Sequence, residues 1–299
     1  MSRDRKGVIK RASVFDLLCL MRMDKPWGSL LLLWPSLWAL WLANEGMPEL
    51  RLLMVFIIGA ILMRSFGCVV NDLLDSDIDR RVERTKKRPL AANLVSKKTA
   101  YMMCGCLSVG AASLLFFLNL QSVYLAVCGF VMACVYPTTK RWLHCPQLFL
   151  GITFAWGIPI AYAASGKVLG FECWFLYVIT AMWIVGYDAI YAMQDLEDDK
   201  QIAVFTLPKY MNGNIQVVVG ILYGAFVLGL GLLARVHRFK NVFFLAWIMV
   251  VGVLIWQVRI LSPDGVNEDK KNLYLQAFKS NQWIGLIVWI ALVLSFLLE

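Results

Sequence analysis

The sequence has 299 residues, of which 60% are hydrophobic and 16% are charged. Soluble domains contain about 45 to 50% apolar and about 25% charged residues, so this composition and a mean hydropathy of +0.66 exclude an ordinary soluble protein. The net charge of +9 is assigned to orientation in a membrane and not to nucleic-acid binding, because the charges lie in short stretches between long apolar blocks.

The N-terminal region is predicted to lie on the membrane surface. Ser13 and Asp16 form an S-x-x-D pattern that is typical of a helix start. The apolar stretch 14–21 is either a short helix in the membrane interface or the beginning of the first span. We expect residues 1–26 to form a cytoplasmic N-terminus with this interfacial helix, and residues 27–299 to form one transmembrane domain. A cleaved signal peptide is not expected, because no cleavage pattern follows the first apolar block.

Nine apolar blocks follow, and most approach the roughly 17 to 25 residues that a spanning helix needs. They cover residues 27–43, 52–70, 100–120, 123–136, 148–164, 171–187, 215–234, 242–258 and 283–298. The fourth block is short and only residues 120–122 separate it from the third, but the two together are far too long for one crossing. The sequence therefore predicts an all-α, multi-pass bundle of about nine transmembrane helices.

The distribution of basic residues predicts the orientation of this bundle. With the N-terminus inside, the inner segments hold 23 Lys and Arg residues and the outer loops hold 5. The positive-inside rule then places the N-terminus on the cytoplasmic or matrix side and the C-terminus outside. The basic loop 235–240 is the exception. The expected location is the bacterial inner (plasma) membrane or the mitochondrial inner membrane.

The eight cysteines fall mostly inside apolar blocks and show no C-x-x-C spacing. We interpret them as small core residues and not as disulfides or metal ligands.

Acidic residues are scarce, and half of them lie in two short segments. The first segment ends the second apolar block and contains Asp72, Asp75, Asp77, Asp79 and Glu83. The second ends the sixth block and contains Asp188, Asp195, Glu197, Asp198 and Asp199. Four spans lie between the two block ends, so both segments are predicted to emerge on the same, cytoplasmic side.

The spacing within each segment places carboxylates on one helix face. In the first, Asn71 or Asp72, Asp75 and Asp79 are three or four residues apart, and the second repeats this spacing at Asp188, Tyr191, Asp195 and Asp199. Like charges about 6 Å apart repel by roughly 3 kcal/mol at an effective dielectric of about 20, so a cation is expected between them.

Oxygen ligands without His or thiolate suit Mg²⁺, which takes one or two carboxylates and leaves positions for water and phosphate oxygens. The pattern predicts a metal-bridged diphosphate, with metal ligands Asp72, Asp75, Asp79, Asp195 and Asp199. The alternative is that both acidic helix ends are solvated faces, neutralised by the basic residues between Arg80 and Arg88.

Two further polar features stand out from the apolar blocks. Arg64 lies inside a span, where arginine costs about 2.5 to 3.5 kcal/mol and is usually functional. It either neutralises the nearby aspartates or binds an anionic group of a small substrate.

The segment 136–141 (Y-P-T-T-K-R) ends the fourth block. It is either part of a substrate site or a helix broken at Pro137 and followed by a basic membrane anchor.

With these residues, the chain resembles the UbiA family of intramembrane prenyltransferases, whose hallmarks are an N-D-x-x-D-x-x-x-D motif and a second D-x-x-x-D. Flanking segments resemble the 4-hydroxybenzoate polyprenyltransferase branch of that family. They are R-M-D-K-P-W-G-S-L-L-L-L-W-P-S-L-W-A-L (22–40), M-R-S-F-G-C-V-V-N-D (63–72), R-P-L (88–90), Y-P-T-T-K-R (136–141), W-G-I-P-I-A-Y-A-A (156–164) and Y-D-A-I-Y-A-M-Q-D (187–195).

The resemblance implies nine helices around a central cavity that both motifs cap from the cytoplasm. It also implies a reaction of ubiquinone biosynthesis, in which a polyprenyl diphosphate alkylates 4-hydroxybenzoate ortho to its hydroxyl with Mg²⁺ as cofactor. The chain departs from the family at residues 202–206, where I-G-x-K-S is replaced by I-A-V-F-T, and at residues 91–93, where a glycine turn is replaced by A-A-N.

These arguments define a set of candidate site residues. The catalytic candidates are Asp72, Asp75, Asp79, Asp195 and Asp199, with Asp188 or Asp195 as a possible base. The substrate-binding candidates are Arg64, Asn71, Arg88, Tyr136, Lys140, Arg141, Tyr187 and Tyr191. The alternatives are a family member with another acceptor (naphthoate, homogentisate or haem) and a membrane transporter. The expected partners are the two substrates and membrane lipid, without nucleic acid.

Overall fold

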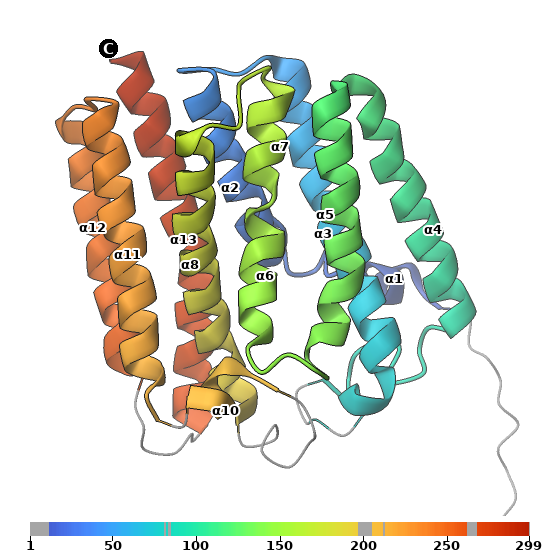
Figure 1. The fold of residues 1–299 in the computed structure, drawn as a ribbon. Coiled ribbons are helices and arrows are strands. Elements are labelled where there is room, and N and C mark those ends of the chain that lie inside the picture. The colour runs from blue at the N-terminus through green and yellow to red at the C-terminus, as the bar shows by residue number, and fades with distance from the viewer. Residues whose placement is uncertain are drawn as a thin grey trace, which may run out of the picture.

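The computed structural model describes residues 12–80, 82, 85–196, 205–211, 213–261 and 268–298. All regular elements within these ranges are helical, which confirms the predicted fold class. Eight helices are long and apolar enough to cross a membrane, and the shorter apolar helix α2 (Trp27–Ala43) lies among them. Figure 1 shows them side by side in one bundle.

The helices follow the predicted apolar blocks closely. After α1 (Val14–Leu20) and α2, the chain forms α3 (Leu50–Asp79), α4 (Lys97–Leu114) with the short η1 (Leu115–Phe117), α5 (Leu120–Thr139), α6 (Pro146–Ala155), α7 (Gly157–Ala164), α8 (Phe171–Ala192), η2 (Met193–Asp195), α10 (Leu207–Met211), α11 (Ile215–Val236), α12 (Asn241–Ile260) and α13 (Glu268–Leu297). The third and fourth blocks are separate helices, because Asn119 caps α5 by accepting a hydrogen bond from the Ser122 N–H.

Helix α1 is separate from the first span, so its alternative interpretation as the beginning of that span is wrong. Ser13 and Asp16 form the predicted capping box: the Ser13 hydroxyl accepts from the Asp16 N–H at 3.1 Å, and the Asp16 carboxylate accepts from the Ser13 N–H at 2.9 Å. Arg22 turns the chain from α1 toward α2 with a left-handed φ of 59°.

Two prolines have effects that differ from the predictions. Helix α5 continues through Pro137 to Thr139, so the expectation that Pro137 breaks the helix is wrong. It lies in the last turn, where one lost hydrogen bond costs little, and the Thr138 and Thr139 hydroxyls bond the preceding carbonyls. The fifth block, in contrast, divides at Trp156 into α6 and α7, because Pro159 cannot donate to the carbonyl four residues earlier.

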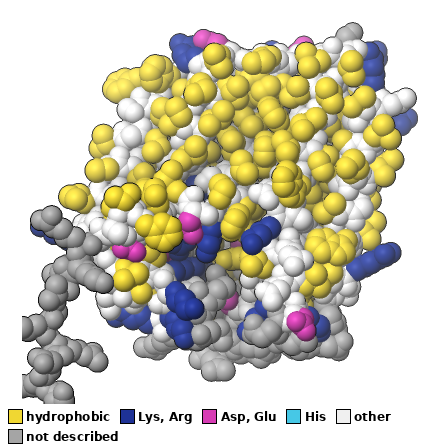
Figure 2. Space-filling view, turned by 180° about the vertical axis from the view of Figure 1, so that it is seen from behind, with side chains coloured by type: hydrophobic (Ala, Val, Ile, Leu, Met, Phe, Trp, Pro, Cys, Tyr) yellow, Lys and Arg dark blue, Asp and Glu magenta, His cyan; other side chains and the backbone are white. Residues whose placement is uncertain are grey.

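The centre of the bundle is built on α2, which packs against α3, α7 and α13. Trp38 is fully buried there, with ring centroids 5.2 Å from Trp183 and 6.2 Å from Phe226. In contrast, α4 and α5 present most of their apolar side chains outward. Figure 2 shows that apolar side chains cover most of the rear face, with charged ones toward its lower end and at its upper rim. The protein is therefore a multi-pass membrane protein.

Candidate active site

A cavity of about 1150 Å³ opens at one end of the bundle and contains both acidic segments in its wall. Figure 1 shows the C-terminal ends of α3 and α8 at this same, lower end. The predicted site residues that line the cavity are Arg64, Asn71, Asp72, Asp75, Asp79, Arg88, Tyr136, Lys140, Arg141, Tyr187, Asp188, Tyr191 and Asp195. Asp199 lies outside the described residues.

The first acidic segment extends the membrane helix α3 without a break to Asp79. Because the helix continues, Asp72, Asp75 and Asp79 share the face toward the cavity, as the spacing predicts, and they are only 1%, 5% and 6% exposed. Asp77 points away from this face, and its side chain is 77% exposed. Three carboxylates are thus buried together at the end of one helix.

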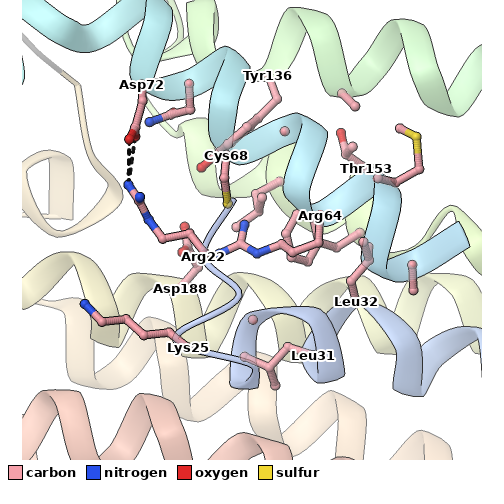
Figure 3. Close-up of a pocket in the computed structure, with 18 of the residues that line it drawn as sticks. Arg22, Lys25, Leu31, Leu32, Arg64, Cys68, Asp72, Tyr136, Thr153 and Asp188 are labelled. Atoms are coloured by element: carbon pink, nitrogen blue, oxygen red, sulfur yellow. Dashed lines mark hydrogen bonds and ion pairs between the residues drawn. The ribbon is translucent and has the colours of Figure 1, made fainter. Parts of the chain in front are cut away.

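Two arginines from distant segments partner the first and last of these carboxylates. Arg22 donates two hydrogen bonds to Asp72, at 2.8 and 2.9 Å, as Figure 3 shows. Arg88 lies 3.2 Å from Asp72 and 2.8 Å from Asp79. Burial has the largest effect on the pKa of Arg22 and lowers it, but the charge of Asp72, the charge of Cys68 and the hydrogen bond to Asp72 together raise it by more, so the net direction is upward and the guanidinium stays charged.

The middle carboxylate meets the basic end of α5. The Lys140 ammonium lies 3.4 Å from Asp75 and 3.5 Å from the Asn71 side-chain oxygen. The Arg141 guanidinium lies 3.6 Å from Asp75 and donates to the Leu74 carbonyl at 2.8 Å. Tyr136, Lys140 and Arg141 of the segment 136–141 thus line the cavity, and the basic pair contacts Asp75.

The second acidic segment faces the first across the cavity. Asp188 lies near the end of α8, and the cations whose charge acts on it are Lys140 and Arg64. After α8 the chain tightens into η2, which carries Asp195 to the cavity wall. Of the acidic residues that the structure describes, Asp72, Asp75 and Asp79 of the first segment and Asp188 and Asp195 of the second therefore line the same cavity.

Arg64 lies about two turns deeper in α3 than Asp72, and still deeper relative to Asp75 and Asp79. Its guanidinium projects into the cavity beyond Cys68 (Figure 3), and its Nε has no hydrogen-bond partner among the described residues. A Cβ atom at Gly28 would lie 2.7 Å from Nε, so that glycine makes room for it. The α3 carboxylates have ion pairs with Arg22, Arg88, Lys140 and Arg141, whereas Arg64 has no ion pair with a described residue.

Aromatic side chains complete the wall around Arg64. Tyr136 comes from α5 and Tyr187 and Tyr191 come from α8. The Tyr187 ring is fixed edge-on against Trp183 at 5.2 Å and against Phe278 at 5.8 Å. Its buried hydroxyl has no hydrogen-bond partner among the residues that the structure describes.

Four basic residues that line the cavity were not among the predicted site residues: Lys87, next to Arg88, and the more distant Arg22, Lys25 and Lys279. Lys279 comes from α13, where it lies 4.7 Å from the centre of the Trp27 ring. In the sequence these residues looked like ordinary positive-inside charges at helix ends. Only the turn at Arg22 and the contact between α2 and α13 bring the three distant residues to the carboxylates.

The substituted turn after R-P-L remains well formed. Asn93 has a left-handed φ of 58°, a conformation that asparagine tolerates better than most residues. Arg80 secures the turn by donating to the Ala91 carbonyl at 3.2 Å and the Asn93 side-chain oxygen at 3.1 Å. Of the other substituted segment, the structure describes Phe205, whose N–H donates to the Lys140 carbonyl at 2.9 Å, and Thr206.

The donor set of the site fits a hard divalent cation. Among the described residues, no three His, Cys, Asp or Glu side chains lie close enough together to bind a metal by themselves. Mg²⁺ does not need such a group, because it typically takes one or two protein carboxylates and completes its shell with water and phosphate oxygens. The carboxylates stand beside cations that themselves match phosphate, so the rim fits a metal diphosphate.

Comparisons with known proteins agree with this geometry. The model of the UbiA prenyltransferase family matches residues 32–282. A 4-hydroxybenzoate octaprenyltransferase of Coxiella burnetii (strain CbuK_Q154) is 37% identical over 286 residues, covering 96% of this chain and 98% of the relative. One of Polynucleobacter asymbioticus is 39% identical over 276 residues, covering 92% and 94%.

Solved structures show the same fold. A UbiA homologue from Aeropyrum pernix K1 superimposes with a TM-score of 0.75 at 20% identity, over 89% of this chain and 97% of that one. A UbiA homologue from Archaeoglobus fulgidus, bound to DMAPP and Mg²⁺, has a TM-score of 0.66 at 14% identity, over 91% and 99%. Because the family model matches most of the chain and the relatives match nearly its whole length, the chain belongs to the UbiA prenyltransferase family.

Proposed function

We propose that this protein transfers a polyprenyl group from polyprenyl diphosphate to the ring of 4-hydroxybenzoate, ortho to its hydroxyl, as an early membrane step of ubiquinone biosynthesis. The observation that carries this proposal is a single cavity with three parts: a rim of carboxylates and cations, Arg64 beneath the rim, and an apolar arm in the membrane that is lined by small residues such as Gly59, Ala60 and Ala126. The relatives from Coxiella burnetii and Polynucleobacter asymbioticus carry the name of this activity.

The rim binds the diphosphate end of the donor. Arg22, Arg88, Lys140 and Arg141 supply charged N–H donors for the phosphate oxygens. The proposed ligands of Mg²⁺ are Asp72, Asp75 and Asp79 on one side and Asp195 and Asp199 on the other. Bound Mg²⁺ would neutralise the charge that develops on the leaving diphosphate. No nucleophilic side chain is required for this chemistry.

The reaction replaces one bond to the allylic carbon with another. The carbon–oxygen bond of the donor breaks, its electron pair leaves with the diphosphate, and the aromatic ring forms a carbon–carbon bond to the allylic cation. Tyr187 and Tyr191 present aromatic rings at this level of the cavity, where they stabilise the cation by a few kcal/mol at most. The ring carbon then loses its proton to a base.

The acceptor binds below the diphosphate, beside Arg64. Its carboxylate matches the planar guanidinium, which has no ion pair with any described residue and whose Nε is buried without a hydrogen-bond partner among them. Asp188, on α8 in the same wall, is the proposed base for the phenol or ring proton, and Tyr136 closes the acceptor pocket from α5. An arginine left unpaired inside a membrane is costly unless a ligand partners it, which supports this assignment.

The active-site end faces the cytoplasm or the mitochondrial matrix in this proposal. The basic residues concentrate at the same end as both acidic segments, and the positive-inside rule places such an end inside. Helix α1 exposes Val14 and Phe15 beside this end, which suits a helix lying in the inner interface. Soluble 4-hydroxybenzoate and Mg²⁺ then enter from inside, while the prenyl donor stays in the lipid.

The decisive experiment is an assay of purified protein in lipid with Mg²⁺, a series of polyprenyl diphosphates and labelled 4-hydroxybenzoate, scored by product mass. We expect a prenylated 4-hydroxybenzoate that disappears when Mg²⁺ is chelated. Exclusive prenylation of a naphthoate, a homogentisate or haem supplied in parallel would assign a different acceptor. If no acceptor is prenylated and vesicles that contain the protein instead take up labelled 4-hydroxybenzoate, the proposed enzymatic function is wrong and the protein is a transporter.

A further inference from the structure

Two aromatic residues support the tyrosines that α8 presents to the cavity. Trp183, one turn earlier on α8, meets the Tyr187 ring edge-on with 5.2 Å between the ring centroids, and Phe278 of α13 meets it at 5.8 Å. Phe278 also packs on the Tyr191 ring at 4.4 Å. Trp183 and Phe278 therefore hold the α8 tyrosines, Tyr187 and Tyr191, in the cavity wall.

A third contact lies behind the same turn of α8. The residue before Tyr187 is Gly186, where a Cβ atom would lie 2.4 Å from the Tyr223 ring of α11. Tyr223 is itself buried, and its hydroxyl donates a hydrogen bond to Gln257 of α12 at 2.7 Å. The α8 backbone beside Tyr187 thus lies directly against a ring that is fixed in place.

The Asn281 side chain of α13 bonds to both supports of Tyr187. Its oxygen accepts a hydrogen bond from the Trp183 indole N–H at 2.9 Å. Its nitrogen donates to the backbone carbonyls of Ala277 at 2.9 Å and Phe278 at 3.3 Å. One buried side chain therefore joins α8 at Trp183 to the turn of α13 that carries Phe278.

Gln257 connects this side chain to the contact behind α8. Its oxygen accepts from Tyr223 at 2.7 Å and from Asn281 at 3.3 Å, and its nitrogen donates to the Ser280 hydroxyl at 2.9 Å. We call Trp183, Tyr223, Gln257 and Asn281 the buried network; none of their side-chain nitrogen or oxygen atoms is left without a partner. A fully bonded network of this kind favours one arrangement of its members.

The buried network lies outside the cavity, and its four members do not line it. The four helices that carry it, α8, α11, α12 and α13, pack on one another at one side of the bundle (Figure 1). Apolar side chains alone could fill this space, but hydrogen bonds also require a particular direction. The network therefore fixes the orientation of the rings as well as their position.

We propose that Asn281 is a positioning residue for the transfer reaction: through Trp183 and Phe278 it holds the α8 tyrosines against the allylic cation and thereby excludes water from it. The inference rests on the proposed function and deepens it. The cation can react in two ways. The acceptor ring forms a carbon–carbon bond to it and loses a ring proton. Alternatively, a water oxygen forms a carbon–oxygen bond to it and a proton is released to the solvent, which gives a prenyl alcohol.

The test measures the ratio of these two products for purified protein in lipid, with Mg²⁺, a prenyl diphosphate and saturating 4-hydroxybenzoate. Asn281→Leu keeps the approximate shape of the side chain and removes its hydrogen bonds. We expect it to raise the ratio of prenyl alcohol to prenylated 4-hydroxybenzoate by about 10-fold or more. Trp183→Phe keeps an aromatic ring and removes the N–H donor, so its ratio should rise by a smaller factor.

A double variant tests whether the two residues act together. If both act through the hydrogen bond between them, Asn281→Leu combined with Trp183→Phe should have about the ratio of Asn281→Leu alone. A ratio equal to the product of the two single effects would mean that they act independently, which contradicts the proposal.

The control is Leu292→Ala, which shortens a buried side chain nearer the C-terminal end of α13 and away from the cavity. Loss of this packing should lower the midpoint of thermal unfolding. Its product ratio should nevertheless stay at the wild-type value, because the buried network is intact.

Two further outcomes would overturn the inference. One is a wild-type product ratio in both Asn281→Leu and Trp183→Phe. The other is a rise in Leu292→Ala as large as that in Asn281→Leu, since the network would then act only through general stability. Because the measure is a ratio within each variant, loss of folded protein does not mimic the effect. Failure of the proposed function is separate, since wild-type protein would then form no prenylated 4-hydroxybenzoate.

Discussion

Asp75 and Asp77 are two residues apart on α3 and meet opposite environments. Asp75 is 5% exposed, lines the cavity and faces Lys140 and Arg141. Asp77 has a side chain that is 77% exposed and lies 3.5 Å from Arg80 outside the site. Because a helix turns by about 100° per residue, a difference of two positions separates the binding face from the solvent face.

This contrast gives a matched pair of variants. We expect Asp75→Asn to lower Mg²⁺-dependent prenyl transfer by about 100-fold or more, because the site loses a negative charge that binds the metal diphosphate. Asp77→Asn should keep wild-type turnover. Steady-state kinetics over a Mg²⁺ titration measures both. Equal turnover in the two variants would show that Asp75 does not contribute to the proposed metal site.

Arg64 allows a second test at the scale of one side chain. Its guanidinium projects into the cavity, and its Nε has no hydrogen-bond partner among the described residues. A hydrogen bond between charged groups is worth about 1.5 to 3 kcal/mol. We therefore expect Arg64→Leu to raise the KM for 4-hydroxybenzoate by about 10- to 100-fold and to change the KM for the diphosphate much less. The reverse ranking of the two constants would contradict the assignment. Arg64→Lys keeps the positive charge but loses the planar guanidinium, so its KM for 4-hydroxybenzoate should lie between that of the wild type and that of Arg64→Leu.

At the scale of elements, close contacts of buried helices define the frame around the cavity. Helix α2 is almost entirely buried, and its tryptophans meet α13 where Gly285 leaves no side chain in the way. On the opposite side, Trp183 of α8 donates to Asn281 of α13 at 2.9 Å, within a buried network that includes Gln257 of α12. The helices behind Tyr187 are thus fixed, whereas α4 and α5 are more loosely held.

The seam between α2 and α13 is expected to be sensitive to a single added methyl group. A Cβ atom at Gly285 would lie 2.0 Å from the Trp34 ring, so Gly285→Ala must move the two helices apart. Overpacking of this kind costs about 1 to 3 kcal/mol. Thermal unfolding in detergent should show a lower midpoint for Gly285→Ala. Gly224→Ala in α11 is the control, since no atom lies within 4 Å of its Cβ position. Equal midpoints for the two variants would refute the close contact.

At the scale of the whole molecule, the charge distribution and the position of the cavity agree. Among the described residues, the basic residues at the end with the acidic segments outnumber those at the far end, which are Arg51, Lys167, Arg235, Arg238 and Lys240. This asymmetry supports the proposed orientation by the positive-inside rule, with the charged rim of the cavity at the inner membrane surface and its apolar part in the bilayer.

The proposed orientation is testable with a membrane-impermeant thiol reagent. In a variant whose eight native cysteines are replaced by alanine, Lys86→Cys is expected to react only from the inner side, in inverted vesicles. Lys167→Cys, in the loop between α7 and α8, is expected to react only from the outer side, in intact cells. Both positions are exposed. The opposite labelling pattern would show that the helix bundle has the reverse orientation in the membrane.

The sequence by itself determined the helical class, the spans and a large part of the site. Hydropathy and the spacing of scarce carboxylates are local properties, and a helix converts spacing into a shared face, as at Asp72, Asp75 and Asp79. Arg64 was also recognisable, because an arginine within a span is conspicuous. The division of the fifth block at Trp156 and the continuation of α5 through Pro137 were not predicted, since both depend on neighbouring contacts.

Only the tertiary structure decided which residues meet. Arg22 reaches Asp72 across 50 positions and Lys140 reaches Asp75 across 65, and no local pattern encodes such pairings. The sequence also does not predict the course of the cavity. Helices α4 and α5 both have the length and composition of membrane-spanning helices, and their apolar residues alone do not show which face contacts lipid and which face lines the cavity. Tertiary packing decides which face lines the cavity, because a cavity forms only where the side chains of neighbouring helices leave space unfilled.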